Sequence, residues 1–163
     1  MTATLDDIEY KKLLSGDTFT ARVSKEVTED GDTLIIMLSV PEESDYAYVF
    51  TELATQSSVR ARSQFTINAD YSGGEEYTAI STRIDSGEIS DLDIVKDPTV
   101  ASADYADEAP LGGGTVRATR VGGTQGRGRI IVEPGNSIGA RITSTSSDDG
   151  VISAIVVGFR IKR

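Results

Sequence analysis

Hydrophobic and polar residues alternate with a period of two along most of the chain after Gly16. In residues 19–27, Phe19, Ala21 and Val23 fall on one face, which is the pattern of a half-buried β-strand. Comparable runs recur between turn-like residues and predict about nine strands. The expected strands are residues 19–27, 33–40, 46–53, 58–71, 76–84, 90–96, 128–133, 137–144 and 150–162. This spacing indicates an all-β fold, which we expect to be a single β-sandwich or jelly-roll domain over residues 17–163.

Turn sequences separate several of these runs. Asp30-Gly31 lies between two β-rich runs, which predicts a β-hairpin. Residues 134–136, Pro-Gly-Asn, predict a further turn. The last run, residues 150–162, is apolar and β-branched, so we expect it to be a central strand.

Residues 1–16 are expected to form a short helical arm. Acidic residues in the first turn, Lys in the last turn and Gly16 just beyond it are typical start and stop signals. Leu5, Ile8 and Leu13 fall roughly on one side, but this apolar stripe is short and the helix is marginal alone. We therefore expect these three side chains to pack on the sandwich or on another subunit.

Composition removes several classes of functional site. The chain contains no Cys, no His and no Trp. Without Cys there are no disulfides, thiolate metal sites or Cys nucleophiles. Without His the usual general base near neutral pH and the Ser–His catalytic unit are missing. No carboxylate pair stands out among the many acids as a pair for glycoside hydrolysis. We therefore expect no enzyme.

Membrane insertion is not expected either. No apolar run approaches the length of about 18 residues that indicates a transmembrane helix. The N-terminus lacks a basic region followed by an apolar one, so we do not expect a signal peptide.

Charge is distributed unevenly along the chain. The chain has 26 acidic and 16 basic residues, for a net charge of −10, and five of the bases are Lys. Abundant acid with scarce Lys is typical of proteins from salt-loving organisms, although an ordinary acidic domain is the alternative. Residues 111–163 hold three acids and eight bases, a net charge of +5, whereas residues 1–110 carry −15. This asymmetry suggests a surface that meets an acidic partner.

Residues 97–129 are expected to be a long loop rich in Gly and Arg. Within them, residues 110–129 contain four Arg, no acid and seven of the 16 glycines. No phosphate-binding motif matches, and the acidic remainder gives no nucleic-acid footprint, so a solvated loop and a docking segment remain. We favour docking, because Arg pairs with carboxylates and Gly lets the backbone conform to a neighbour. The candidate docking residues are Arg117, Arg120, Arg127 and Arg129.

Acidic clusters and tyrosines offer weaker candidates. Acids gather in residues 29–32, 91–93 and 104–108, but none of these stretches fits a calcium-binding loop. Surface charge is the simpler interpretation of these clusters, so we expect no cofactor. Weak binding of a cation to one of them remains the alternative. Tyr46 and Tyr48 alternate in an expected strand and form either a ligand platform or one face of the core.

Several short stretches resemble a known family when taken in order. They are YKKLLSGDTFT, DGDTLIIMLSVP, KDPT, EPGNS followed by RITSTS, and the β-rich C-terminal strand. Together they resemble a family of small all-β virion proteins of tailed viruses, of the head-associated or decoration type. The resemblance implies a structural, non-enzymatic virion component. Combined with the acidic surface, it suggests a virus of a halophilic archaeon.

We therefore expect a structural virion protein that decorates or cements the capsid or forms a turret-type component. Its expected partners are itself, as a trimer or pentamer, and the major capsid protein or other virion proteins, with no nucleic acid and no membrane. It would be located in the virion after assembly in the host cytoplasm. The alternative is a tail-tip or fibre module that binds a receptor or glycan, because one fold serves both roles.

Overall fold

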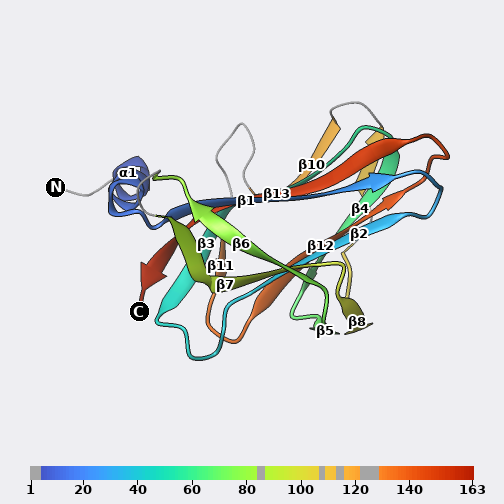
Figure 1. Ribbon diagram of the computed structural model, residues 1–163. Helices are drawn as coiled ribbons and strands as arrows, with labels where there is room; N and C mark the ends of the chain where they lie inside the picture. Colours follow the sequence, from blue (N-terminus) through green and yellow to red (C-terminus); the bar gives the residue numbers. More distant parts are fainter. Residues whose placement is uncertain (1–4, 84–86, 107–108, 113–115, 122–128) are drawn as a thin grey trace.

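The computed structural model describes residues 5–83, 87–106, 109–112, 116–121 and 129–163 (Figure 1). In this part of the chain, one helix, α1 (Leu5–Ser15), precedes thirteen strands. The strands are β1 (Thr18–Val27), β2 (Thr33–Ser39), β3 (Tyr46–Ser57), β4 (Arg60–Ile67), β5 (Asp70–Ser72), β6 (Glu75–Ser81), β7 (Glu88–Lys96), β8 (Thr99–Ser102), β9 (Ala109–Gly112), β10 (Val116–Val121), β11 (Ile130–Val132), β12 (Ser137–Ser144) and β13 (Gly150–Lys162). The expected all-β fold with a short N-terminal helix is confirmed.

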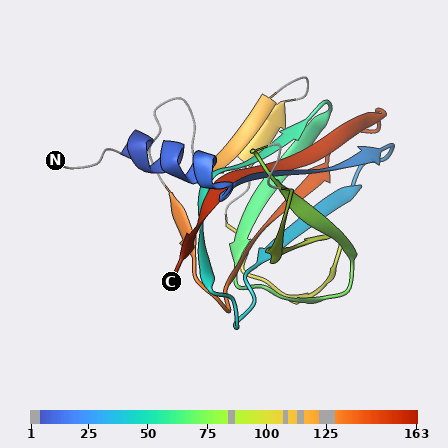
Figure 2. The ribbon, with the colours of Figure 1, turned by 60° about the vertical axis from the view of Figure 1, so that its left-hand side comes forward.

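Eleven of the strands form one antiparallel sheet, which is strongly curled (Figures 1 and 2). The order across it is β10, β3, β13, β1, β6, β7, β2, β12, β4 and β9, and β11 pairs with β3. The strands at the two ends of this order, β9 and β10, follow each other in the chain and lie in contact. The sheet therefore wraps its inner face around one core. β5 and β8 form a separate two-stranded sheet.

β13 is an internal strand of the sheet, paired on both sides with β1 and β3, as its apolar sequence predicts. Its register with β3 shifts between Val157 and Gly158. A Cβ atom on Gly158 would lie 2.2 Å from the carbonyl oxygen of Val49 and 3.1 Å from Cα of Phe50. Because both contacts are with backbone atoms, which cannot move aside cheaply, the two strands need glycine at this point.

Aromatic side chains from β1 and β3 fill the middle of the core. Phe19, Tyr48 and Phe50 are fully buried. The ring of Phe19 meets the rings of Tyr48 and Phe50 edge-on, at centroid distances of 5.5 and 5.9 Å. The core interpretation of the tyrosine stripe is therefore confirmed for Tyr48, whereas Tyr46 is partly buried and packs against the core from its margin.

The hairpin predicted at Asp30-Gly31 is wrong, although the turn exists. β1 pairs with β13 and β6, whereas β2 pairs with β12 and β7. The N–H of Gly31, at φ 95°, donates to the carbonyl of Ser144 at 2.9 Å. The Asp30-Gly31 sequence reverses the direction of the chain, but it does not determine which strand pairs with β1. The long apolar β13 pairs with β1 instead of β2.

The prediction of one continuous loop over residues 97–129 is also wrong. β8 pairs with β5, β9 pairs with β4, and β10 pairs with β3. β8 and β9 have only four residues each, β10 lies between glycine-rich stretches, and the partners of all three strands lie outside this part of the sequence. Local β propensity therefore gave no signal for them, because pairing context decides such segments.

Gly16 ends the helix as the sequence predicts. Its φ is 78°, in the left-handed region. The N–H of Gly16 donates to the carbonyl of Leu13 at 3.1 Å, and the N–H of Asp17 donates to the carbonyl of Lys12 at 3.0 Å. This pair of hydrogen bonds is a Schellman motif, which turns the chain sharply from α1 into β1.

Replacement of Gly158 by Ala tests the close approach of β13 and β3. We expect Gly158→Ala to lower the free energy of unfolding by about 1–3 kcal/mol, because the new methyl group must push two backbones apart. Thermal unfolding followed by circular dichroism measures the change. Ser24→Ala, at an exposed position on β1, is the matched control. Equal stability of the two variants would contradict the tight approach.

Candidate functional site

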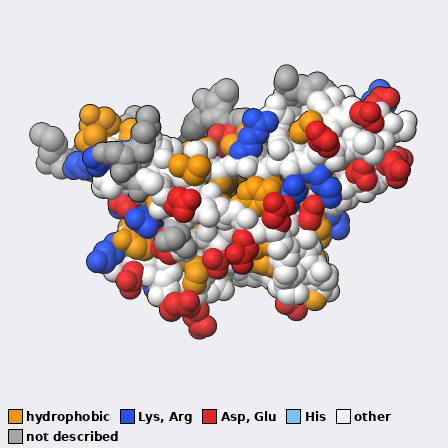
Figure 3. All heavy atoms as spheres, viewed as in Figure 1, with side chains coloured by type: hydrophobic (Ala, Val, Ile, Leu, Met, Phe, Trp, Pro, Cys, Tyr) orange, Lys and Arg blue, Asp and Glu red, His pale blue; other side chains and the backbone are white. Residues whose placement is uncertain are grey.

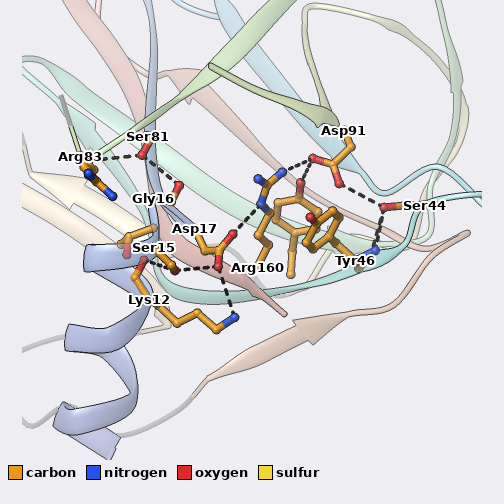
Figure 4. Close-up of polar contacts among 12 residues, drawn as sticks. Lys12, Ser15, Gly16, Asp17, Ser44, Tyr46, Ser81, Arg83, Asp91 and Arg160 are labelled. Atoms are coloured by element: carbon orange, nitrogen blue, oxygen red, sulfur yellow. Dashed lines mark hydrogen bonds and ion pairs between the residues drawn. The ribbon is translucent and has the colours of Figure 1, made fainter. Parts of the chain in front are cut away.

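The end of helix α1 is tied to the sheet by a charged cluster (Figure 4). The carboxylate of Asp17, just after the helix, accepts hydrogen bonds from Ser15 Oγ at 2.7 Å and from Arg160 Nε at 3.0 Å. Lys12 Nζ lies 3.4 Å from the same carboxylate. The backbone N–H of Arg160 also donates to the carbonyl of Asp17 at 3.0 Å. Helix, linker and β13 therefore meet at one residue.

Arg160 extends this cluster across the sheet to β7. Its Nη1 donates to Asp91 Oδ1 at 3.1 Å, and its guanidinium carbon lies 4.3 Å from the centre of the Tyr46 ring. The same carboxylate accepts the hydroxyl of Tyr48, in a short hydrogen bond, and the hydroxyl of Ser44 at 3.3 Å. One guanidinium thus connects two carboxylates and an aromatic face, which is the combination that suits Arg.

The electrostatics of the cluster favour fixed charge states. Partial burial acts to raise the pKa of Asp17, but hydrogen bonds from Ser15 and Arg160 and the charge of Lys12 outweigh it and lower that pKa below its ordinary value of 3.8. Burial, then the hydrogen bond to Asp91 and the charge of that carboxylate, raises the pKa of Tyr48. Asp17 therefore stays ionised and Tyr48 stays protonated near neutral pH, so these two groups hold structure rather than exchange protons.

Two further contacts hold the C-terminal turn of α1. Arg83 Nη1 donates to the carbonyl of Leu14 at 2.6 Å, and the hydroxyl of Ser81 donates to the carbonyl of Gly16 at 3.0 Å. Both donors come from β6 or the residues directly after it. Carbonyls at a helix end need such partners, and here they also fix the helix to the sheet.

Exposed apolar side chains concentrate at this end of the molecule. On α1, Tyr10 is 62% exposed, Leu14 55% and Leu13 39%. Figure 3 shows hydrophobic side chains on the surface where Figure 1 places the helix. Three more exposed apolar side chains lie on strands of the sheet: Ile80 on β6 beside the start of β1, Ile161 at the end of β13, and Ile131 on β11, which pairs with β3. Of the exposed large hydrophobic residues in the described part of the chain, Ile67 and Val151 lie elsewhere.

The helix residues predicted for docking are partly placed by the structure. Leu5 and Ile8 belong to α1, but their side chains lie outside the described part. Leu13 is exposed, as docking requires. The sequence analysis did not select Tyr10 and Leu14, which are more exposed than Leu13. It selected only residues on one side of the helix, the side expected to pack on the sandwich or on another subunit. The pair of leucines before Ser15 was the available signal.

Two of the arginines predicted for docking, Arg117 and Arg120, lie on β10, which pairs with β3. Arg117 lies opposite Gln56 in the β10–β3 pairing, and Arg120 lies at the register shift of β10. Arg129 is half-buried directly before β11, and Arg127 lies outside the described residues. Since β10 and β11 both pair with β3, Val121 and Ile130 lie beside the same strand.

The structure also bears on metal and membrane binding. Within the described ranges, no group of three or more His, Cys, Asp or Glu side chains is arranged to hold a metal ion. No helix in those ranges is long and apolar enough to cross a membrane. In the acidic stretch at residues 29–32, Asp32 stabilises its own turn. Its carboxylate accepts hydrogen bonds from the backbone N–H groups of Thr28 and Glu29 at 2.8 and 3.0 Å.

Comparison with known proteins gave no relatives: no protein-family model, no curated protein and no solved structure matches the chain.

The lowered pKa of Asp17 predicts acid sensitivity at the helix junction. Ionised Asp17 stabilises the fold fully above its ordinary pKa of 3.8, and the contribution is lost as the pH falls through the lowered pKa of the folded state. We expect Asp17→Asn to cost about 1–3 kcal/mol of unfolding free energy at pH 7. The difference from wild type should shrink toward zero in acid, as urea unfolding at a series of pH values would show. A difference that does not change with pH would contradict this role.

Arg160 should matter more than an exposed cation near it. We expect Arg160→Met to lower the unfolding free energy by about 2–3 kcal/mol, because two half-buried carboxylates lose their partner. Arg163→Met is the control, since Arg163 pairs with Glu133 at 3.3 Å on the open surface, where an ion pair contributes about 0–1 kcal/mol. Hydrogen exchange should also be faster in α1 of the Arg160 variant. Equal effects of the two substitutions would contradict the linking role.

Proposed function

We propose that this protein is a non-enzymatic structural component of a virion, which assembles as a homo-oligomer and decorates or cements the capsid or forms a turret on it. The proposal includes a jelly-roll arrangement of the curled sheet and an origin in a virus of a halophilic archaeon. Trimers or pentamers, contacts with the major capsid protein or other virion proteins, and location in the virion belong to the same proposal. The family resemblance of the ordered sequence stretches supports it.

The observation that carries the proposal is the apolar end of the molecule around α1. Tyr10, Leu13 and Leu14 are exposed on a helix whose C-terminal turn is held to the sheet by Asp17, Arg160 and Arg83. Exposed apolar groups that are contiguous and rigidly presented favour an interface. Holding the helix in place lowers the entropy that association costs.

The occupant that we propose for this surface is a second copy of the chain. Residues 1–110 carry −15 and residues 111–163 carry +5, so copies can complement each other. At about 1 M salt the screening length is about 3 Å, so exposed charge pairs contribute little there. Apolar contacts then hold the interface, and closed symmetry bounds the number of copies.

Light scattering on the purified protein at molar and at low salt tests the proposal. We expect a discrete trimer or pentamer at molar salt that dissociates or unfolds at low salt. Leu13→Ser combined with Leu14→Ser should weaken assembly at least about 100-fold, because each buried Leu contributes about 1.5–3 kcal/mol. Circular dichroism would show that the variant keeps its fold.

Matched substitutions elsewhere on the surface serve as the control. Ile67→Ser with Val151→Ser removes two exposed apolar side chains away from α1 and should leave the oligomer intact. A wild-type monomer at every salt concentration would refute the assembly proposal and favour the receptor- or glycan-binding module. Equal loss of assembly in both double variants would refute the role of the α1 end.

A further inference from the structure

A groove with acidic and aromatic walls lies along β6 and β7, the strands that cross the front of Figure 1. Its volume is about 470 Å³, within the range of ligand sites in proteins. Tyr77 from β6 and Tyr71 from β5 line it, together with the carboxylates of Glu76, Glu88 and Asp93. The tyrosines are half-buried and the three acids are exposed.

The negative charge of this groove is not balanced by the residues around it. Among the residues that the structure describes, no Lys or Arg lines the groove and no cation pairs with Glu76, Glu88 or Asp93. Partial burial raises the pKa of Asp93, and repulsion from Glu76 and two further carboxylates raises it more. Lys96 lies outside the lining and approaches Glu75, 4.0 Å away. The groove therefore offers a site at which a cation would be attracted.

Elsewhere in this protein, tyrosine rings lie next to arginine side chains that are also bonded to oxygen acceptors. Arg160 stacks on Tyr46 while it pairs with carboxylates, as described above. Arg141 lies 3.9 Å from the centre of the Tyr105 ring and donates to Gln64 Oε1 through its Nε at 3.1 Å. Each arginine thus has an aromatic face and an oxygen acceptor. The groove likewise has tyrosines and oxygen acceptors in its lining, and no arginine is among the described lining residues.

We propose that this groove binds guanidinium groups of residues 110–129 from a second copy of the chain, an inference that rests on the proposed self-assembly. That segment has four Arg and no acid, so its charge complements the groove. Seven of its residues are Gly, the residue type whose backbone is least restricted. Assembly would then join the apolar α1 contact with a charged contact between copies.

Chain length favours a neighbouring copy over the groove of the same copy. Val121 and Ile130 are both held against β3, at Leu53 and Phe50. A chain that leaves Val121 and returns at Ile130 reaches about 15 Å outward even when fully extended. The sheet order places β13 and β1 between β3 and β6, so β6 is three strand spacings away, about 14 Å along a curved surface, and the groove extends further to β7. β10, the strand that carries Arg117 and Arg120, lies one strand further from the groove than β3, about 19 Å from β6 along the sheet, whereas a second copy imposes no such separation.

Other ligands fit the walls less well. A divalent metal would need several close ligands, and no such group is present in the described ranges. An anion would be repelled. A neutral glycan could stack on Tyr71 or Tyr77, but it would leave three carboxylates without a counter-charge. Lysine could supply the charge, but it lacks the planar group that stacks and forks.

Calorimetric titration of a synthetic peptide with the sequence of residues 110–129 into the full-length protein at low salt tests the site. We expect binding to wild type and at least about tenfold weaker binding to the variant that combines Glu76→Gln with Asp93→Asn, because charge-assisted hydrogen bonds are lost. The variant that combines Glu29→Gln with Asp30→Asn neutralises two acids of the exposed β1–β2 turn and should bind like wild type. A peptide with Lys in place of the four Arg should bind more weakly, and one with Ser should not bind.

Each outcome separates this inference from the proposed function. Equal peptide affinity of the groove variant and the turn variant would overturn the inference, as would a groove that takes a neutral oligosaccharide and not the peptide. If light scattering showed the oligomer intact in the groove variant while Leu13→Ser with Leu14→Ser dissolved it, assembly through α1 would stand and the groove contact between copies would be refuted. A wild-type monomer at every salt concentration that still bound the peptide through the groove would refute the proposed function and support the ligand class.

Discussion

The curl of the antiparallel sheet is the constraint on which the other features depend. β1 and β3 carry large apolar side chains on their inner face, and a flat sheet would leave Phe19, Tyr48 and Phe50 in water. Curling until β9 lies against β10 encloses these side chains and brings the two ends of the sheet together. Edge strands that lie against each other are less accessible to unwanted pairing with other chains. Glycine at position 158 permits the close approach of β13 and β3 that this shape needs.

Arg160 compensates the repulsion between two carboxylates that the curled sheet brings close to it. Bending brings Asp17 at the start of β1 and Asp91 on β7 within reach of one point on β13. Two half-buried carboxylates would repel each other there, and a single guanidinium between them turns the repulsion into attachment. Because Asp17 directly follows α1, the same contact sets the direction of the helix. The hydrogen bonds of Asp17 therefore fix the helix in an orientation that leaves Tyr10, Leu13 and Leu14 exposed to solvent.

In the proposed assembly, two kinds of contact between copies would respond oppositely to salt. Apolar contacts at the α1 end strengthen as salt rises, whereas contacts between Arg and carboxylates weaken unless the pair is stacked and desolvated. The acidic groove with its tyrosines supplies the aromatic face that a desolvated arginine needs. If the chain assembles in concentrated salt as we propose, the two kinds of contact together would hold the interface over a wider range of salt than either one alone.

The sequence by itself determined the features that depend on neighbours a few residues apart. Period-two alternation indicated the all-β fold, Gly16 marked the end of the helix, and the apolar run of β13 marked a central strand. Tertiary structure alone decided that β1 pairs with β13 rather than with β2, that Asp17, Asp91 and Arg160 meet, and that Tyr71 and Tyr77 line one groove. Turn and helix signals act through local backbone geometry, whereas strand partners are chosen by competition for burial across the whole sheet. The residue pattern of one segment therefore does not predict which strand it will pair with.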